Sequence, residues 1–383
     1  MYHTNKLEDM LSEGYSKKWA KYFLLGIEQD NQMGVFEEEY AKWAHIQGFF
    51  ATHAYAYGLN ENNVDNYLSD YDYYKVWPLN SWSRIWINDK LTLKYMLHGT
   101  EYSHLMPKYY FYSTPSGLKP LMDVDMSTHA SIEDAFFDTL HRVGELACKP
   151  NNGTESRGFV RISIENGSYC FNGAKCDKDQ ILTFLQDNPN YIFTEYLRPS
   201  DEFKKFSDQI HTLRIVTINE NGYSPKIVAG FLRFPNSTCG EANYNVFETD
   251  IESKYNLYTY IDINDGSLEK SIKTYVSHIE STDIHPDTKE TLVGELPHYD
   301  ELVKEIEGIC RLMSNVEYMG FDFGVTNDGY KLMEINSHPG INTSQTREPF
   351  FLNETIGQFF KNKLEDLNNL SEEEKKKRTL LVR

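Results

Sequence analysis

The sequence lacks a surplus of positive charge. Of its 383 residues, 57 are Asp or Glu and only 38 are Lys or Arg, which gives a formal net charge of −19. A protein whose main function is to bind nucleic acid or an anionic membrane needs the opposite balance. A phosphorylated small molecule is not excluded as a ligand, because a few local cations or Mg²⁺ can dominate the field in a cleft.

Long apolar runs are also absent. The N-terminus, MYHTNKLEDM, has no apolar signal core, and no stretch reaches the roughly 18–20 apolar residues that a membrane span needs. The five cysteines are an odd number without CxxC spacing, which predicts reduced thiols. We therefore expect a cytoplasmic protein with no membrane span. The sequence does not indicate an oligomeric state.

Two common nucleotide-binding signatures are missing. No GxGxxG follows a predicted strand, and no glycine-rich loop ends in GKS or GKT before a helix. Nothing in the sequence therefore signals a Rossmann domain, and the glycine-containing loop does not follow the Walker pattern. Any nucleotide site must be built in another way.

What the sequence does contain is centred on residues 320–340, GFDFGVTNDGYKLMEINSHPG. Two strands joined by the turn Thr326-Asn-Asp-Gly329 are predicted. Because side chains alternate along a strand, one face of the first strand carries Phe321, Phe323 and Val325, and the other carries Gly320, Asp322 and Gly324. In the second strand, alternation puts Leu332, Glu334 and Asn336 on one face. If the loop is residues 327–329, Asp322 lies directly opposite Glu334.

Asp322, Glu334 and Asn336 all offer oxygen ligands. Such hard ligands suit Mg²⁺, which usually shares its coordination sphere with water and nucleotide phosphates. The glycines beside Asp322 leave room for a bulky ligand. The alternative is a hairpin whose polar face simply meets water.

Two lysines precede this hairpin in suggestive positions. Lys90 lies in the first turn of a helix that Asn88 or Asp89 caps. A cation in this position is unfavourable to the helix dipole, unless the lysine and the helix N-terminus together bind an anion. Lys149 lies at the root of the loop NNGTESRG, which includes Gly153, Ser156 and Gly158 and can offer backbone N–H groups to phosphates. A surface lysine and a plain turn are the alternatives.

Two further patterns fit a nucleotide and its reaction partner. The strand 191–197 ends in Glu195-Tyr196-Leu197, whose backbone can meet an adenine edge, and Glu202 follows as an acid for ribose hydroxyls. Arg214 and Arg233 interrupt two apolar strands, 210–218 and 226–234, and buried Arg needs an anionic partner. They can grip a phosphoryl group and a carboxylate, or pair with the surplus acids.

The rest of the chain supplies the frame. Residues 1–85 show helical spacing and many aromatic residues, which we interpret as core packing, and the segment around Pro78 is a plausible boundary. Residues 236–256 are polar and irregular, a candidate lid or substrate loop. The tail after Asn353 is predicted to be helical, with the charge run SEEEKKKR as a solvated helix end.

In this order, these motifs resemble the ATP-grasp superfamily. More narrowly, HTLRIVT, AGFLRFP, HPDTKETLVGELPHYDEL and the hairpin sequence resemble its sugar-transfer-associated proteins, over about residues 80–355. The resemblance implies an α+β fold in which two lobes, residues 86–195 and 196–370, hold ATP between them. A helical N-terminal region of residues 1–85 and a charged tail of residues 371–383 would flank these lobes.

The resemblance also implies roles for these residues. Lys90, Lys149 and the loop with Gly153, Ser156 and Gly158 would contact the ATP phosphates, while Glu195, Tyr196 and Leu197 would meet adenine and Glu202 the ribose. Asp322, Glu334 and Asn336 would bind Mg²⁺, with Arg214 and Arg233 stabilising the phosphoryl group. Three features depart from the family pattern: fewer glycines in the phosphate loop, Asn245 without the glycine pair expected after it, and a helical N-terminus.

The implied function is an ATP- and Mg²⁺-dependent carboxylate-amine ligase that forms an amide through an acyl phosphate. The substrates would be small-molecule or glycan carboxylates and amines, such as a hexuronic acid, in bacterial surface-polysaccharide biosynthesis. One alternative is a sugar kinase with His211 or His338 as base. Another is a nucleotide-binding protein without turnover.

Overall fold

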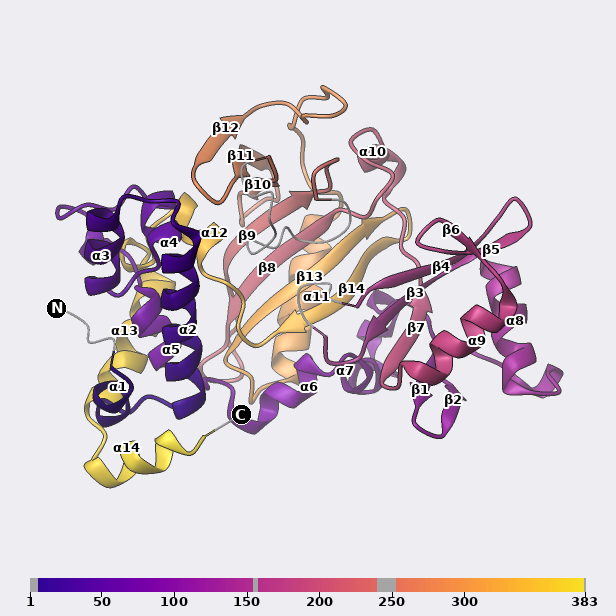
Figure 1. The fold of residues 1–383 in the computed structure, drawn as a ribbon, viewed down its shortest axis with the longest axis horizontal. Helices are drawn as coiled ribbons and strands as arrows, with labels where there is room; N and C mark the ends of the chain where they lie inside the picture. Colours follow the sequence, from indigo (N-terminus) through magenta and orange to yellow (C-terminus); the bar gives the residue numbers. More distant parts are fainter. Residues whose placement is uncertain (1–5, 154–157, 240–252, 382–383) are drawn as a thin grey trace.

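The computed structural model describes residues 6–153, 158–239 and 253–381 of the chain. Residues 7–105 are helical, as predicted for the N-terminal region, and contain no strand. Figure 1 shows the first helices gathered at one end of the molecule. The helices of this part are α1 (Leu7–Ser12), α2 (Lys17–Met33), α3 (Glu38–Ile46), α4 (Ala51–Ala56), η1 (Val64–Asn66), α5 (Asp70–Lys75), η2 (Ser81–Arg84), α6 (Ile85–Asn88), α7 (Lys90–Leu97) and η3 (Glu101–Leu105).

The first lobe is built on an antiparallel sheet with strand order β2-β1-β7-β3-β4-β5-β6. Helix α8 packs an aromatic face on this sheet, with Phe136 between Phe111 and Phe193. Its N-terminus is capped by Ser131, whose side chain accepts a hydrogen bond from the Asp134 N–H. The elements are β1 (Tyr109–Thr114), β2 (Gly117–Pro120), η4 (Met126–Thr128), α8 (Ile132–Val143), β3 (Glu145–Pro150), β4 (Val160–Glu165), β5 (Ser168–Phe171), β6 (Ala174–Cys176), α9 (Lys178–Asp187) and β7 (Tyr191–Glu195).

The second lobe contains another antiparallel sheet, with strand order β12-β11-β10-β9-β8-β13-β14. The predicted hairpin forms its edge as β13 and β14. The elements are α10 (Asp201–Lys204), β8 (Thr212–Ile218), β9 (Lys226–Phe234), β10 (Asn256–Ile261), β11 (Leu268–Thr274), β12 (Ile279–Thr282), α11 (Tyr299–Leu312), β13 (Tyr318–Thr326), β14 (Gly329–Asn336), α12 (Asn342–Arg347), η5 (Phe350–Leu352), α13 (Glu354–Asn368) and α14 (Glu372–Thr379).

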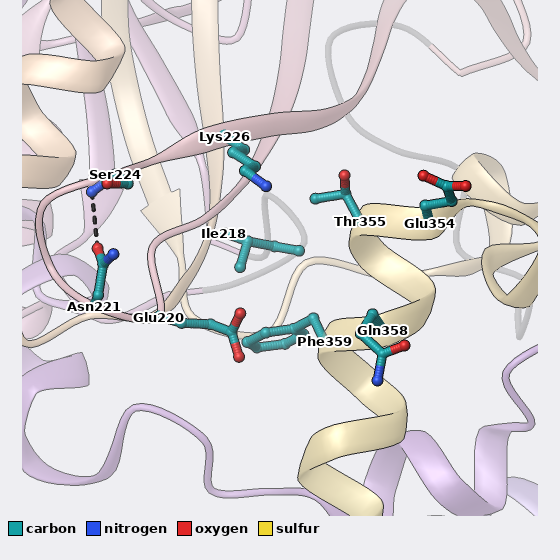
Figure 2. Close-up of a pocket in the computed structure, with 9 residues that line it drawn as sticks. All are labelled: Ile218, Glu220, Asn221, Ser224, Lys226, Glu354, Thr355, Gln358 and Phe359. Carbon is teal, nitrogen blue, oxygen red and sulfur yellow. Dashed lines mark hydrogen bonds between the residues drawn. The ribbon is translucent and has the colours of Figure 1, made fainter.

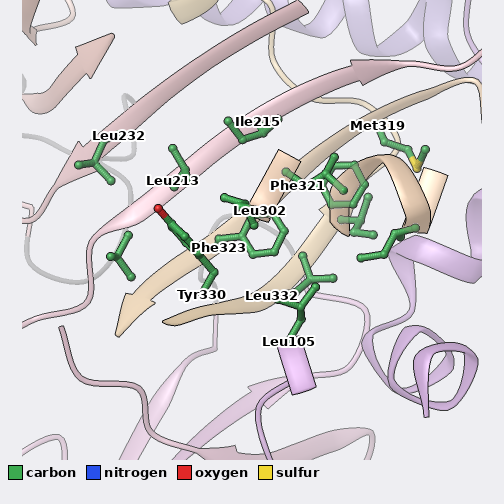
Figure 3. Packing of buried hydrophobic residues seen from close by; sticks show 14 of the residues in the cluster. Leu105, Leu213, Ile215, Leu232, Leu302, Met319, Phe321, Phe323, Tyr330 and Leu332 are labelled. Carbon is green, nitrogen blue, oxygen red and sulfur yellow. The ribbon is translucent and has the colours of Figure 1, made fainter. Parts of the chain in front are cut away.

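One face of the second sheet carries the largest core. Leu213, Ile215, Phe321, Phe323 and Leu332 pack there with the apolar side of α11 (Figure 3). These side chains are almost wholly removed from water. The core holds the strands β8, β13 and β14 in a fixed register, and their other face carries Arg214 and Asp322 as well as Val216 and Tyr318 of a second core.

The N-terminal region packs against the second lobe rather than standing apart. Trp19, Tyr73 and Trp77 share a core with Tyr318 of β13 and with α13. The amide of Asn80, which is buried, donates to the Tyr318 carbonyl at 2.7 Å and accepts from the Glu317 N–H at 2.8 Å. Buried backbone groups need such partners, so Asn80 fixes the start of β13.

The charge run at the C-terminus is more than the solvated helix end that the sequence predicts. Arg378 on α14 donates to three backbone carbonyls, those of Gly14, Lys75 and Trp77, at 2.7–3.0 Å. Burial lowers the pKa of Arg378 to about 10. The charge pattern alone did not predict these hydrogen bonds, because their acceptors lie in the N-terminal region. In the described residues, no helix combines the length and apolar character that crossing a membrane takes.

Candidate active site

The hairpin brings Asp322 opposite Glu334, as predicted, but by another route. The connection is only two residues long, because Thr326 pairs with Gly329. With that turn alone, regular pairing would place Met333 opposite Asp322. A β-bulge between the pairs of Asp322 and Phe323 shifts the register by one residue and aligns the two carboxylates.

The structure overturns two details of the sequence prediction. Leu332 does not share the polar face with Glu334, since it is fully buried in the core with Phe323. The glycines also leave no empty space. A Cβ on Gly320 would lie 2.5 Å from the Pro339 side chain, and one on Gly324 would lie 2.9 Å from Ile210. The small residues admit protein atoms rather than a ligand.

The polar face of the hairpin carries a connected cluster of five side chains. Arg214 of β8 grips Asp322 with two hydrogen bonds, Nε–Oδ1 at 2.5 Å and Nη2–Oδ2 at 2.8 Å. The Asn336 amide donates to Asp322 at 3.0 Å and to Glu334 at 3.2 Å. Lys90 of α7 lies with its Nζ 3.0 Å from Glu334 Oε2. Two acids, two cations and one amide therefore meet at this edge of the sheet.

The charges in the cluster shift one another's protonation. Burial raises the pKa of Asp322 and outweighs Arg214, which lowers it. Burial acts in the same direction on Glu334, but Lys90, Asn336 and Arg214 lower its pKa to about 2. Asp322 in turn raises the pKa of Arg214 against the effect of burial. The negative charge of the cluster is thus held most firmly on Glu334.

Three consecutive residues at the start of α7 tie this cluster to both lobes, which the sequence analysis did not foresee. Asn88 donates to Ser337 Oγ at 2.9 Å and accepts from the Ser337 N–H at 3.1 Å, just beyond Asn336. Asp89 caps α7 and also accepts from Asn151 at 2.7 Å and Asn152 at 2.9 Å. Both of these follow β3, which belongs to the first lobe. The helix-capping pattern at 88–89 was the only sequence signal for these contacts.

Lys90 of α7 and Lys149 of β3 both lie at the root of the predicted phosphate loop. Besides Glu334, Lys90 donates to the Gly153 carbonyl at 2.9 Å, so it reaches the predicted phosphate loop. Burial lowers the pKa of Lys149 to about 8, and the neighbouring charge of Lys90 adds to this. Within the described residues Lys149 makes no ion pair. Two cations held close together at a loop root favour an anionic ligand.

This pKa gives a testable dependence of anion binding on pH. Lys149 carries its charge below pH 8 and loses it above, so the affinity for a nucleotide should fall as pH rises from 7 to 9. Lys149→Arg should remove most of that slope, because guanidinium stays charged. Titration with a non-hydrolysable ATP analogue by calorimetry measures it. An identical slope in the wild type and Lys149→Arg would contradict the assignment.

The predicted adenine segment lies at the end of β7. The Glu195 side chain accepts from the Lys108 N–H at 3.1 Å, and the Tyr196 ring has Arg198 over it, 4.7 Å from the ring centroid. Leu197 lies next to Gly324 on the polar face of the hairpin. Glu202 is exposed on α10. Within the part of the chain that the structure describes, no hydrogen bond or ion pair joins Glu195, Leu197 or Glu202 to the acid cluster.

Of the remaining predicted residues, the structure describes Arg233 and Gly158. Arg233 is buried on β9, opposite Thr212 of β8 and Tyr258 of β10, and Asp322 and Arg214 both act on its charge. Gly158 has φ 77° and its carbonyl accepts from the Tyr191 hydroxyl at 3.0 Å. Ser156, Asn245 and most of the predicted lid at 236–256 lie outside the described residues.

The two histidines considered as bases lie away from the polar face of the hairpin. His211 is fully buried among Phe203, Phe206 and Phe234, and burial, with His285 and Arg233, lowers its pKa to about 3. The His338 ring packs between Trp19 and Trp77, and burial holds its pKa well below the usual value. Neither is suited to take a proton at neutral pH.

A separate pocket of about 460 Å³ lies between the β8–β9 turn and the first turns of α13 (Figure 2). Its floor is formed by Ile218 and Phe359, and Lys226 points into it. Its walls are polar side chains from those two segments. No residue of the acid cluster lines this pocket.

Comparison with known protein families decides the relationship. The model of the sugar-transfer associated ATP-grasp family matches residues 88–353, which is more than half of the chain. The chain belongs to this family. The match begins at Asn88 and therefore includes the junction residues, both lysines and the whole hairpin. It leaves the N-terminal helices α1–α5 outside the ATP-grasp match.

Solved structures similar to this ATP-grasp chain are distant in sequence. They include an L-amino acid ligase from Bacillus licheniformis (11% identity, 74% of this chain and 48% of that one, TM-score 0.39). A D-alanyl-alanine synthetase A from Vibrio cholerae has 14% identity, with 75% and 66% covered and a TM-score of 0.43. The chain thus spans about half to two thirds of the length of these proteins. No curated protein matches the sequence.

Proposed function

We propose that the protein is an ATP- and Mg²⁺-dependent carboxylate-amine ligase. The observation that carries this proposal is the junction at the start of α7. There Lys90 joins the phosphate loop of the first lobe to the acid cluster of the second. Membership of an ATP-grasp family supports ATP as the nucleotide.

The nucleotide would lie between the lobes. Lys90 and Lys149 supply two cations for its phosphates, with Gly153, Ser156 and Gly158 in the loop above them. The strand end at Glu195, Tyr196 and Leu197 would receive adenine, and Glu202 the ribose hydroxyls. Leu197 supports this placement, because it lies on the same face of the hairpin as Asp322.

The donor set of the cluster fits Mg²⁺. Asp322, Glu334 and Asn336 lie on paired strands, carry carboxylate and amide oxygens that can ligate a metal, and lie beside cations that balance the charge of the two acids. These three residues would hold the ion. When bound, Mg²⁺ would neutralise phosphate charge and orient the β- and γ-phosphates.

The reaction that suits this arrangement has two steps. A substrate carboxylate oxygen attacks the γ-phosphorus and ADP leaves, which gives an acyl phosphate. An amine then attacks the acyl carbon. The bond between the acyl carbon and the bridging oxygen breaks, phosphate leaves with that oxygen, and the nitrogen releases a proton to give the amide. Lys90, Lys149, Arg214 and Arg233 would contribute by positioning groups and by stabilising negative charge.

The substrates are proposed from the family alone. Its description as sugar-transfer associated supports a sugar acid or an amino acid, joined to an amine during surface-polysaccharide synthesis. We place the reaction in the cytoplasm, where ATP is supplied. A sugar kinase has less support, because neither His211 nor His338 lies where a base is needed.

Hydroxamate formation tests this proposal. The protein is incubated with ATP, Mg²⁺, hydroxylamine and a panel of uronic acids, nucleotide-linked uronic acids and amino acids. We expect at least one carboxylate to give a hydroxamate together with ADP. If a sugar stimulates ADP release and no hydroxamate appears with any acid, the protein transfers phosphate to a hydroxyl instead.

A further inference from the structure

Every carboxylate oxygen of the acid cluster already has an N–H partner. Asp322 Oδ1 accepts from Arg214, and Oδ2 accepts from Arg214 and Asn336. Glu334 Oε1 accepts from Asn336, and Oε2 lies 3.0 Å from the Lys90 ammonium. These contacts join the five side chains of the cluster into one closed network.

The two groups that would have to change for a metal to enter are identifiable. Asn336 turns its Nδ2, not its oxygen, toward the acids, although only the oxygen can ligate a metal. Lys90 places a full positive charge against Glu334, where a divalent cation would otherwise gain its largest attraction. Arg214 pairs with Asp322 from the neighbouring strand β8 and is not part of the phosphate loop.

The backbone of Lys90 is fixed, and its buried side chain ends in an ammonium that is shared between Glu334 and the Gly153 carbonyl. The Lys90 N–H donates to the Asn151 carbonyl at 3.3 Å, and the Leu91 N–H donates to the Asn151 side chain at 2.8 Å. Asp89 holds both Asn151 and Asn152. The start of α7 and the root of the phosphate loop are therefore one unit. Only the ammonium has to move to leave Glu334.

A phosphate that binds at the loop would attract the Lys90 ammonium away from Glu334. Lys90 also donates to the Gly153 carbonyl in the phosphate loop, so its ammonium already lies at the loop. A phosphate group carries full negative charge and would outcompete a neutral carbonyl and a single carboxylate that is shared with Asn336. The charge removed from Glu334 would then be replaced by the metal.

We propose that Lys90 is an internal counter-ion that keeps divalent metal out of the Asp322–Glu334–Asn336 cluster until a nucleotide phosphate draws the Lys90 ammonium away from Glu334. Metal binding then depends on nucleotide binding, and the enzyme does not fill its metal site alone. This inference rests on the proposed function for the nucleotide, and it concerns the order of binding rather than the reaction.

Binding of Mn²⁺, which shares the oxygen ligands of Mg²⁺, tests the inference without turnover. Free Mn²⁺ is followed by electron paramagnetic resonance with the full chain, with and without a non-hydrolysable ATP analogue. In the wild type, we expect the analogue to tighten Mn²⁺ binding about tenfold or more. In Lys90→Met, Mn²⁺ alone should bind about tenfold more tightly than to the wild type, since a charge 3.0 Å from the ligand oxygen is gone.

Two variants separate charge from packing. Lys90→Arg keeps the positive charge and should bind Mn²⁺ alone as weakly as the wild type. Lys94→Met is the matched control, because Lys94 is equally buried one turn later on α7 and pairs with Asp123 at 3.0 Å, away from the cluster. It should leave Mn²⁺ binding unchanged while costing similar stability.

An unchanged or weaker affinity of Lys90→Met for Mn²⁺ alone overturns the inference, as does tight binding of Mn²⁺ to the nucleotide-free wild type. Failure of the ligase proposal is a different result. The hydroxamate assay would then be negative, while the Lys90-dependent change in Mn²⁺ binding would remain.

Discussion

Glu334→Gln is expected to reduce ATP-dependent turnover by roughly a thousandfold or more, the scale seen when a charged group that stabilises a phosphoryl-transfer transition state is removed. The amide keeps the shape and one oxygen, but it loses the negative charge that holds Lys90 and would hold the metal. Steady-state ADP release measures the effect. Affinity for the ATP analogue should survive, because the two lysines and the loop are unchanged.

The matched control for this variant is Glu317→Gln. Glu317 precedes the same hairpin and pairs with Lys363 at 2.6 Å, outside the acid cluster. It should retain turnover within about twofold, as expected for a partly exposed ion pair. If Glu334→Gln turns over at a rate close to that of the wild type, Glu334 is not a metal ligand.

Arg214→Ala is expected to lower the free energy of unfolding by about 3–5 kcal/mol. The change leaves the buried Asp322 carboxylate without the guanidinium that satisfies both of its oxygens, and an unpartnered buried charge is far more costly than a missing pair. Urea denaturation followed by circular dichroism measures the loss.

The double variant Arg214→Met, Asp322→Leu distinguishes this cause from lost packing. It replaces both charges with apolar groups and should recover most of the stability while remaining inactive. Equal destabilisation of the single and double variants would show that the loss does not come from an unpartnered Asp322 carboxylate.

Much of the fold could be predicted because its signals are local. The capped helix α7 and the strand β9 follow from a cap and from apolar spacing, and the structure has them where predicted. The pairing of Asp322 with Glu334 was also predicted. The bulge that produces it was not, because nothing in the local sequence marks one extra residue on β14.

The interactions that tie the site together could not be predicted in the same way. The contacts of Asn88 with Ser337, of Asp89 with Asn151 and of Lys90 with Glu334 join residues that are 62 to 249 positions apart. Arg378 likewise looked like part of a solvated charge run, and its partners lie some 300 residues away. Such pairings depend on how the lobes pack, which no spacing rule specifies.

The central claim is that a substrate carboxylate accepts the γ-phosphoryl group of ATP. The most direct test uses the carboxylate identified by the hydroxamate assay, labelled with ¹⁸O in both oxygens, in a complete reaction with its amine. Mass spectrometry of the released phosphate should find one ¹⁸O atom in each phosphate, because an acyl phosphate keeps the bridging oxygen on phosphorus when the amine displaces it. Unlabelled phosphate, or phosphate retained on the substrate as an ester, would contradict the account.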